Sequence, residues 1–266
     1  MVRRWCIPLA GAALVVGSVA ASAPAAAAGR VSHAPAVVHQ VRPGGRMIRP
    51  GSPLIGHSFS RNASQSTNWS GYAATGRFTS VSATWTEPAG HCTSATRYAS
   101  FWVGLDGFNS NTVEQTGSDV DCSGGSPVYY SWYEMYPAYP VNFRNTVRPG
   151  DHLFGSVTFT GGSGYTLVLQ DTTRGWSHTV HKTLSGAANS SAEVIAEAPC
   201  CTASGGILPL ADFGTVNFSN AKANGSAIGN SSPVQINMVD GSGRLKDQTS
   251  ALSGGGSFSD TWLRAN

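Results

Sequence analysis

The chain has few charged residues and lacks the sequence signatures of the common hydrolases. Charged side chains make up 12% of its 266 residues. It contains no Gly-x-Ser-x-Gly, no His-Glu-x-x-His, no Asp-Thr-Gly and no glycine-rich phosphate loop, which excludes the usual serine, zinc and aspartic mechanisms and nucleotide phosphate binding. No Cys-x-x-Cys or His-x-x-x-His spacing occurs either, so we expect no metal site.

Acidic residues are absent from the N-terminal part. None precedes Glu87, whereas seven of the 17 lysines and arginines lie at or before Arg61. The formal charge of +3 therefore hides an acidic remainder, in which ten bases face 14 acids. Because bases are sparse there, we do not expect nucleic acid as a partner.

The first 28 residues have the layout of a secretory signal peptide. Met1-Val2-Arg3-Arg4 precedes an apolar run over residues 7–21 and then small residues. The apolar run is too short for a spanning helix. Cys6 precedes the apolar run, whereas a lipid-modified cysteine would have to stand at the cleavage point. We therefore predict cleavage near residues 26–28, export to the extracellular space and no membrane anchor.

Residues 29–67 are rich in Pro, Gly, Ser, Arg and His and show no periodic apolar pattern. Such a composition predicts a largely disordered segment. Two readings stay open: a solvated linker, or a basic pro-segment that covers an acidic cleft by ion pairing.

Residues 68–266 have the length of one domain and the pattern of an all-β fold. Short alternating runs are separated by Gly, Asn, Asp and Ser turns, without a helical period. This pattern favours a sandwich of two antiparallel sheets, concanavalin-like, over a sheet closed on itself, and we expect a monomer. Residues 225–232 and 241–256 are predicted to be surface loops. The predicted strands cover residues 71–74, 80–86, 99–105, 112–118, 128–136, 152–160, 165–171, 176–181, 191–197, 213–221 and 234–239.

Four cysteines follow the signal peptide, namely Cys92, Cys122, Cys200 and Cys201. An even number in an exported chain predicts up to two disulfides, with three possible connectivities. Since adjacent cysteines bond each other only with strain, we expect Cys200 or Cys201 to reach Cys92 or Cys122.

Three carboxylates stand within apolar strands, where a charge must be paired or its pKa shifted. Glu134 lies among five aromatic residues. Glu193 and Glu197 share one face of their strand, because side chains alternate between faces. Alternation alone favours a solvated outer surface for that face.

Six blocks, in order along the chain, together resemble the glutamic peptidases (eqolisins), secreted acid peptidases of fungi and bacteria, and point to a bacterial-type member. They are Asn68-Trp69-Ser70-Gly71-Tyr72, Trp102-Val103-Gly104-Leu105-Asp106-Gly107, Glu114-Gln115-Thr116-Gly117-Ser118-Asp119, Trp132-Tyr133-Glu134-Met135-Tyr136-Pro137, Ala192-Glu193-Val194-Ile195-Ala196-Glu197 and Leu210-Ala211-Asp212-Phe213-Gly214.

The resemblance implies a β-sandwich whose concave face carries a catalytic Gln and Glu, which match Gln115 and Glu197. In the implied mechanism the Glu takes a proton from the attacking water and returns one to the leaving amine. The Gln amide stabilises the oxyanion. Protein or peptide substrates are implied, and no cofactor, because the pair uses only water.

The same matching implies substrate-binding and supporting roles for five more residues: Trp69, Trp102, Asp106, Asp119 and Glu134. Tyr72 and Trp132 are interpreted as core residues.

The chain departs from the fungal pattern at three places. Val194 replaces a common aromatic, Ala198-Pro199 replaces an Asp-Phe pair, and Tyr130 stands where an acid is often found. We therefore do not transfer specificity or pH optimum.

Two alternative functions from other classes stay open. Aromatic residues on a β face also suit a non-catalytic carbohydrate- or peptide-binding sandwich. A two-carboxylate glycosidase would need Glu134 to face Glu193 or Glu197 at about 5 to 9.5 Å.

Overall fold

The computed structural model describes residues 63–199 and 207–266, which belong to one compact unit, Ala36–Asn266. The predicted signal peptide, nearly all of the 29–67 segment, Cys200 and Cys201 lie outside the described residues. Within the described ranges the chain is all β except for one short 3-10 helix, Ile228–Ser231. The predicted fold class is confirmed.

The strands of the described residues are β1 (Ala63–Ser66), β2 (Trp69–Thr75), β3 (Ser80–Thr86), β4 (Arg97–Leu105), β5 (Val113–Ser123), β6 (Ser126–Tyr136), β7 (Val141–Asn142), β8 (His152–Gly161), β9 (Gly164–Asp171), β10 (Trp176–Thr183), β11 (Ser191–Glu197), β12 (Thr215–Ala223), β13 (Ser226–Ala227), β14 (Val234–Val239), β15 (Leu245–Thr249) and β16 (Phe258–Trp262).

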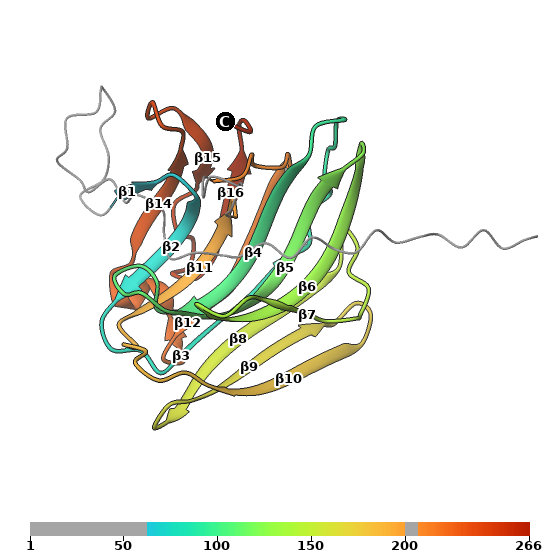
Figure 1. Ribbon diagram of the computed structural model, residues 1–266. Helices are drawn as coiled ribbons and strands as arrows, with labels where there is room; N and C mark the ends of the chain where they lie inside the picture. The colour runs from blue at the N-terminus through green and yellow to red at the C-terminus, as the bar shows by residue number, and fades with distance from the viewer. Residues whose placement is uncertain (1–62, 200–206) are drawn as a thin grey trace, which may run out of the picture. The chain divides into compact units, whose positions relative to one another are not determined.

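These strands form one hydrogen-bonded sheet that folds back on itself into two layers (Figure 1). The first layer has the order β14-β2-β11-β4-β5-β6-β7 and the second has the order β10-β9-β8-β3-β12-β16, with β15 joining them between β14 and β16. Neighbours on this path are antiparallel, whereas β1 pairs with β14 in parallel. The sandwich therefore keeps one continuous ladder through the edge where the layers meet.

The main core lies between the two layers. On β3 the residues Val81, Ala83 and Trp85 point inward and are buried, while the intervening polar residues are partly exposed. Phe101 and Val103 of β4 meet them from the other layer. Burying each large apolar side chain stabilises the fold by roughly 1.5–3 kcal/mol.

The first layer is also covered on its other face. A second cluster there contains Trp69, Ala73, Trp102, Val113, Tyr130, Trp132, Ile195 and Ile236. Strand β11 is consequently buried along its whole length, Glu193 and Glu197 included. The solvated outer surface that alternation alone favours for these glutamates is wrong, because both side chains are fully buried beside the apolar residues of this second cluster.

Most predicted strands are confirmed, and β3, β11 and β14 have the predicted bounds. Two expectations fail, because β15 lies inside the predicted 241–256 loop, and residues 225–232 contain β13 and the 3-10 helix. Strand β1 lies at the end of the 29–67 segment. Strands with these polar sequences show no apolar alternation, so their pairing depends on partners elsewhere in the chain.

The cysteine expectation is corrected. Cys92 and Cys122 bond each other, joining the loop before β4 to the end of β5 across a separation of 30 residues. Neither is therefore available to Cys200 or Cys201. Connectivity escaped the sequence because only the register of β4 on β5, which sets Arg97 opposite Cys122, brings this end of the hairpin to the Cys92 loop.

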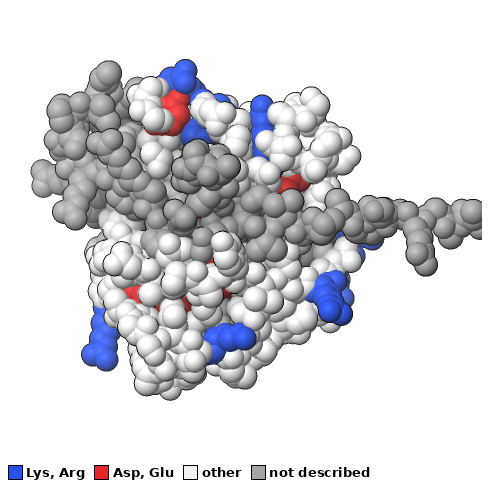
Figure 2. Space-filling model, in the orientation of Figure 1, with Lys and Arg blue, Asp and Glu red and all other residues white. Residues whose placement is uncertain are grey.

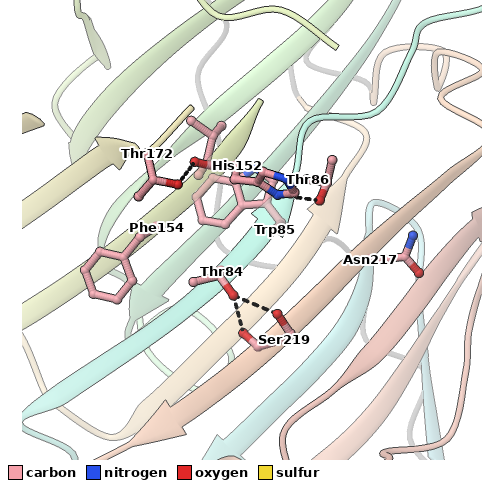
Figure 3. Close-up of a pocket in the computed structure, with 9 residues that line it drawn as sticks. Thr84, Trp85, Thr86, His152, Phe154, Thr172, Asn217 and Ser219 are labelled. Carbon is pink, nitrogen blue, oxygen red and sulfur yellow. Dashed lines mark hydrogen bonds between the residues drawn. The ribbon is translucent and has the colours of Figure 1, made fainter. Parts of the chain in front are cut away.

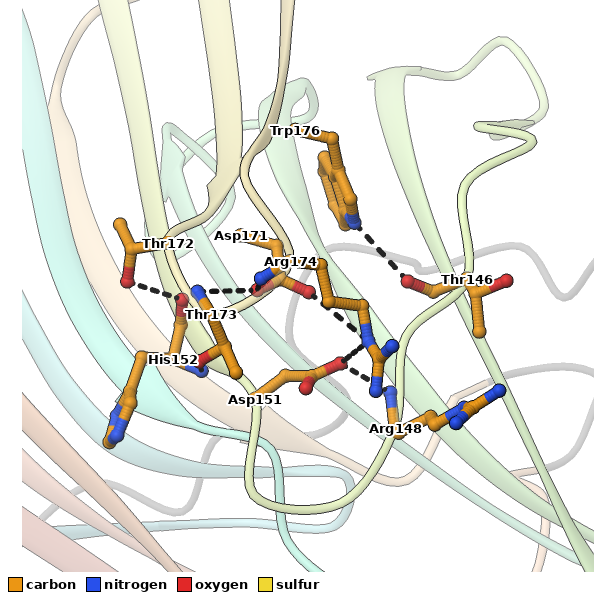
Figure 4. Close-up of polar contacts among 9 residues, drawn as sticks. All are labelled: Thr146, Arg148, Asp151, His152, Asp171, Thr172, Thr173, Arg174 and Trp176. Atoms are coloured by element: carbon orange, nitrogen blue, oxygen red, sulfur yellow. Dashed lines mark hydrogen bonds and ion pairs between the residues drawn. The ribbon is translucent and has the colours of Figure 1, made fainter.

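An ion pair fixes the far end of the second layer (Figure 4). Arg174, in the turn between β9 and β10, contacts Asp151 before β8 at 2.5 Å. Asp151 also accepts from the backbone N–H of Arg148, and Asp171 accepts from those of Thr173 and Arg174.

Within the described part, no helix is long and apolar enough to cross a membrane.

Candidate active site

The candidate residues occupy rows that run across β2, β11, β4, β5 and β6 on the covered face of the first layer, which we call the site face. The strand register defines three rows. From β2 to β6 they read Ala73, Glu193, Gly104, Gln115 and Glu134; then Gly71, Ile195, Trp102, Gly117 and Trp132; then Trp69, Glu197, Ser100, Asp119 and Tyr130.

Glycines open the middle of this face. A Cβ on Gly117 would lie 2.3 Å from the carbonyl oxygen of Phe101, and one on Gly104 would lie 2.9 Å from the Trp102 ring. With no side chain at either position, the long side chains of Gln115 and Trp102 spread over the sheet. The rows with Gln115 and Glu197 are thereby separated by the Trp102 row alone.

Glu197 is fully buried and has a donor at each carboxyl oxygen. The indole N–H of Trp102 donates to Oε2 at 2.9 Å, and Nδ2 of Asn68 donates to Oε1 at 3.1 Å. Burial raises its pKa well above the usual value; Trp102 opposes this, the charge of Glu134 adds to it, and Asn68 opposes it. Two donors thus hold the orientation of a carboxyl group that has an elevated proton affinity.

Gln115 is tied to Glu134 on the neighbouring strand. Its Nε2 donates to Oε2 of Glu134 at 2.7 Å, and both residues are fully buried. This contact sets the orientation of the amide, so Oε1 faces away from Glu134, and it meets no hydrogen-bond partner among the described residues. Because Nε2 carries two hydrogens, one remains for another acceptor.

Asp119 lies on the site face, and its hydrogen bonds come from residues other than Gln115 and Glu197. It accepts from Nε1 of Trp132 at 2.5 Å and from the hydroxyl of Tyr130 at 2.9 Å. The Tyr130 hydroxyl also lies 2.8 Å from Asp121. Burial raises the pKa of Asp119 to about 6. Trp132, interpreted from sequence as a core residue, is therefore part of the site face.

Trp69 and Trp102 pack edge to face, with ring centroids 5.0 Å apart at 76°. This contact supports the indole that donates to Glu197. Tyr72, by contrast, belongs to the core between the layers, as expected.

Asp106 is separate from the Gln and Glu pair. It follows β4 in a left-handed conformation, with φ of 69°, and its carboxylate accepts from the backbone N–H groups of residues 188–190 at 2.7 to 2.9 Å. Its contacts are those of a residue that anchors the loop before β11. The substrate-binding or supporting role that the resemblance implies for Asp106 stays a prediction.

Sequence reasoning missed Asn68 as a site residue, although it opens the first block of the resemblance. Its signal was its place directly before Trp69, which pairs with Glu197 across β2 and β11.

Carboxyl groups are buried throughout the domain. Of the 14 acidic side chains, 12 are buried, and Figure 2 shows few of them on the visible face. Burial raises the pKa of Glu114 to about 8 and that of Asp247 to about 7. Such groups are accommodated best when they are protonated and uncharged.

The described residues contain no group of three or more His, Cys, Asp or Glu side chains placed to hold a metal ion.

A separate groove of about 290 Å³ lies on the second layer over β3, β8 and β12 (Figure 3). Its lining includes Thr84, His152 and Asn217 and has no carboxylate, so it offers no carboxyl pair like that of the site face.

The fold and the site together define a β-sandwich with an amide and a carboxyl group on one covered face. Comparison with known proteins gives the family: the chain belongs to the peptidase A4 family, whose profile matches residues 67–259. The resemblance to glutamic peptidases is thereby confirmed.

Individual relatives support the same family. The chain is similar to aspergillopepsin-2 of Aspergillus niger, with 36% identity over 138 residues, 49% of this chain and 48% of the relative. It thus spans about half the length of that curated relative. Among solved structures it is similar to aspergilloglutamic peptidase from Aspergillus niger, with a TM-score of 0.54, 30% identity and coverage of 63% of this chain and 99% of that one.

A further solved structure is scytalido-glutamic peptidase with a peptide-based transition-state analogue. The TM-score is 0.61, the identity is 26%, and the match covers 74% of this chain and 98% of that one.

Proposed function

We propose that the protein is a secreted glutamic endopeptidase that hydrolyses peptide bonds of protein or peptide substrates at acidic pH, with Gln115 and Glu197 as its catalytic pair. Membership of the peptidase A4 family supports this proposal. The observation that carries the assignment is the site face itself, where Glu197 is held by two donors and the Gln115 amide is oriented by Glu134.

In the proposed reaction Glu197 is the general base. Its ionised carboxylate removes a proton from a water molecule as the water oxygen attacks the carbonyl carbon of the peptide bond. The second hydrogen on Nε2 of Gln115 stabilises the oxyanion that forms, and Oε1 accepts a hydrogen bond from the water. The carboxyl group then gives its proton to the nitrogen of the leaving amine as the C–N bond breaks.

The elevated pKa of Glu197 suits the second half of this cycle. A carboxyl group with a raised pKa holds the proton until the amine takes it, whereas the donors on Oε1 and Oε2 favour the ionised form needed for the first half. We expect the acidic limb of the pH profile to report this ionisation.

The test is digestion of a denatured, non-glycosylated protein by the acid-treated full chain between about pH 2 and pH 7. Glu197→Gln and Gln115→Ala should abolish cleavage while circular dichroism and thermal unfolding show a folded domain. Glu193→Gln is the matched control, because it makes the same change on the same face of β11 and should keep activity.

Three outcomes would contradict the proposal. If all variants cleave like the wild type, the pair is wrong. If Glu193→Gln is inactive and Glu197→Gln is active, the base is Glu193. If no protein is cleaved but a glycan is hydrolysed, the protein is a glycosidase, and Glu134 and Glu197, which interact electrostatically, are its two carboxylates.

A further inference from the structure

Two residues at the start of the domain form a hydrogen-bonded chain that ends on Glu197. The hydroxyl of Ser66, the last residue of β1, donates to Oδ1 of Asn68 at 3.0 Å. Nδ2 of Asn68 then donates to Oε1 of Glu197 at 3.1 Å. All three side chains are fully buried.

The orientation of the Asn68 amide follows from the surroundings of Ser66. Its Oγ accepts from the backbone N–H groups of Asn68 and Trp69 at 3.3 and 3.1 Å. Those contacts occupy the lone pairs of Oγ, so the hydroxyl hydrogen is left for Oδ1 of Asn68. A flipped amide would direct its NH₂ group at an oxygen that has no acceptor capacity left.

The backbone holds the same geometry. The carbonyl of Asn68 accepts from the N–H of Ala198, the residue after Glu197, at 2.8 Å. Ser66 is in turn held by the parallel pairing of β1 with β14, where it lies opposite Met238. The amide and the carboxyl group are therefore fixed to each other at both the side chain and the main chain.

We propose that Ser66 and Asn68 are positioning residues for Glu197: together they hold its Oε1 with a donor that cannot reverse. The inference rests on the proposed function, in which Glu197 is the base. A reversible amide could turn its oxygen toward a protonated Glu197 and stabilise that form. The Ser66 hydroxyl prevents this, so Asn68 always favours the ionised base.

The other neighbours of Glu197 make this donor important. Glu134 on β6 is the titratable group that faces it, and its negative charge opposes ionisation. The contacts from β4 and β2 are the neutral indoles of Trp102 and Trp69. Trp102, then Asn68, and then Trp69 lower the pKa of Glu197 and so offset burial and the charge of Glu134.

The test compares Asn68→Ala, Asn68→Asp and Ser66→Ala in the full chain by the pH dependence of kcat/KM. Loss of a hydrogen bond to a charged group should move the acidic limb of Asn68→Ala up by about one pH unit and lower activity on that limb about tenfold. Asn68→Asp should shift it further by charge repulsion, and Ser66→Ala should shift it less.

Two measurements separate positioning from mere support of the fold. In an Asn68→Ala background, Ser66→Ala should have no additional effect on the limb, because Ser66 acts through the amide. Asn217→Asp is the matched control, since it introduces the same charge at an exposed position of β12 and should leave the profile unchanged.

Unshifted limbs in Asn68→Ala and Asn68→Asp would overturn the inference, as would additive effects of the two alanine variants. Glu197→Gln, assayed in parallel, separates failure of the positioning role from failure of the proposed function. If it is inactive while the Asn68 limbs are unshifted, only the positioning role fails. If it is active, the proposed function fails.

Discussion

Glu114 allows a quantitative prediction about stability and pH. This residue of β5 points away from the site face, is fully buried, and neither carboxyl oxygen meets a hydrogen-bond partner among the described residues. Burial and then the charge of Asp106 raise its pKa from 4.5 to about 8. Ionisation of Glu114 should therefore destabilise the folded state.

The sign and size follow from linkage. Because the folded pKa is above the unfolded one, the stabilisation is complete below about pH 4.5 and is lost as the pH rises through about 8. At pH 7 the wild type should have lost about 3 kcal/mol through this single group.

Glu114→Gln keeps the shape of the side chain and removes its titration. Urea unfolding at pH 4 should give similar free energies for variant and wild type, whereas at pH 7 the variant should be the more stable by about 3 kcal/mol. Asp240→Asn is the control of opposite sign, because hydrogen bonds, first from Ser242, lower the pKa of Asp240. Parallel pH profiles for Glu114→Gln and wild type would refute the reasoning.

Three further changes test the fold. Replacing Cys92 and Cys122 by serine should cost about 3–4 kcal/mol in the free energy of unfolding, because the chain between them spans 30 residues; an unchanged urea midpoint would contradict this. Gly117→Ala should lower the Tm markedly and cost about 2 kcal/mol or more, since its Cβ would meet the Phe101 carbonyl at 2.3 Å; a wild-type Tm would show that β5 can shift. Asp106→Ala leaves the backbone N–H groups of residues 188–190 without their acceptor and should cost about 3 kcal/mol. Limited proteolysis should then cut in that loop, and equal protection would argue against an anchoring role.

Local pattern was enough to find the strands whose alternation is apolar. The residues of β3 and β11 alternate strongly, and the sequence predicts their bounds correctly. Strand β15 was missed because its buried side chains are polar: Asp247 contacts the Ser70 hydroxyl, and Thr249 donates to Asp260 at 2.6 Å. Those partners are brought together only by the fold.

The candidate site likewise combines features that the sequence predicts with features that only the fold decides. The resemblance carried by the ordered blocks of the sequence implies Gln115 and Glu197 as the catalytic pair. Alternation along the strand places Glu193 on the face of Glu197. The burial of this face of β11, with its two glutamates, was decided only by the tertiary structure, in which Trp69, Trp102 and other apolar residues form a cluster there.

The sequence by itself determined the all-β class, the strand parity and the residue types available for acid–base chemistry, because all of these follow from local order along the chain. The tertiary structure decided the Cys92–Cys122 pairing, the burial of 12 carboxyl groups and the contact of Asn68 with Glu197. The physical reason is that alternation fixes which side chains share a face. The partners and the solvent exposure of that face depend on residues far apart in the chain, such as Asn68 and Glu197, which are 129 residues apart.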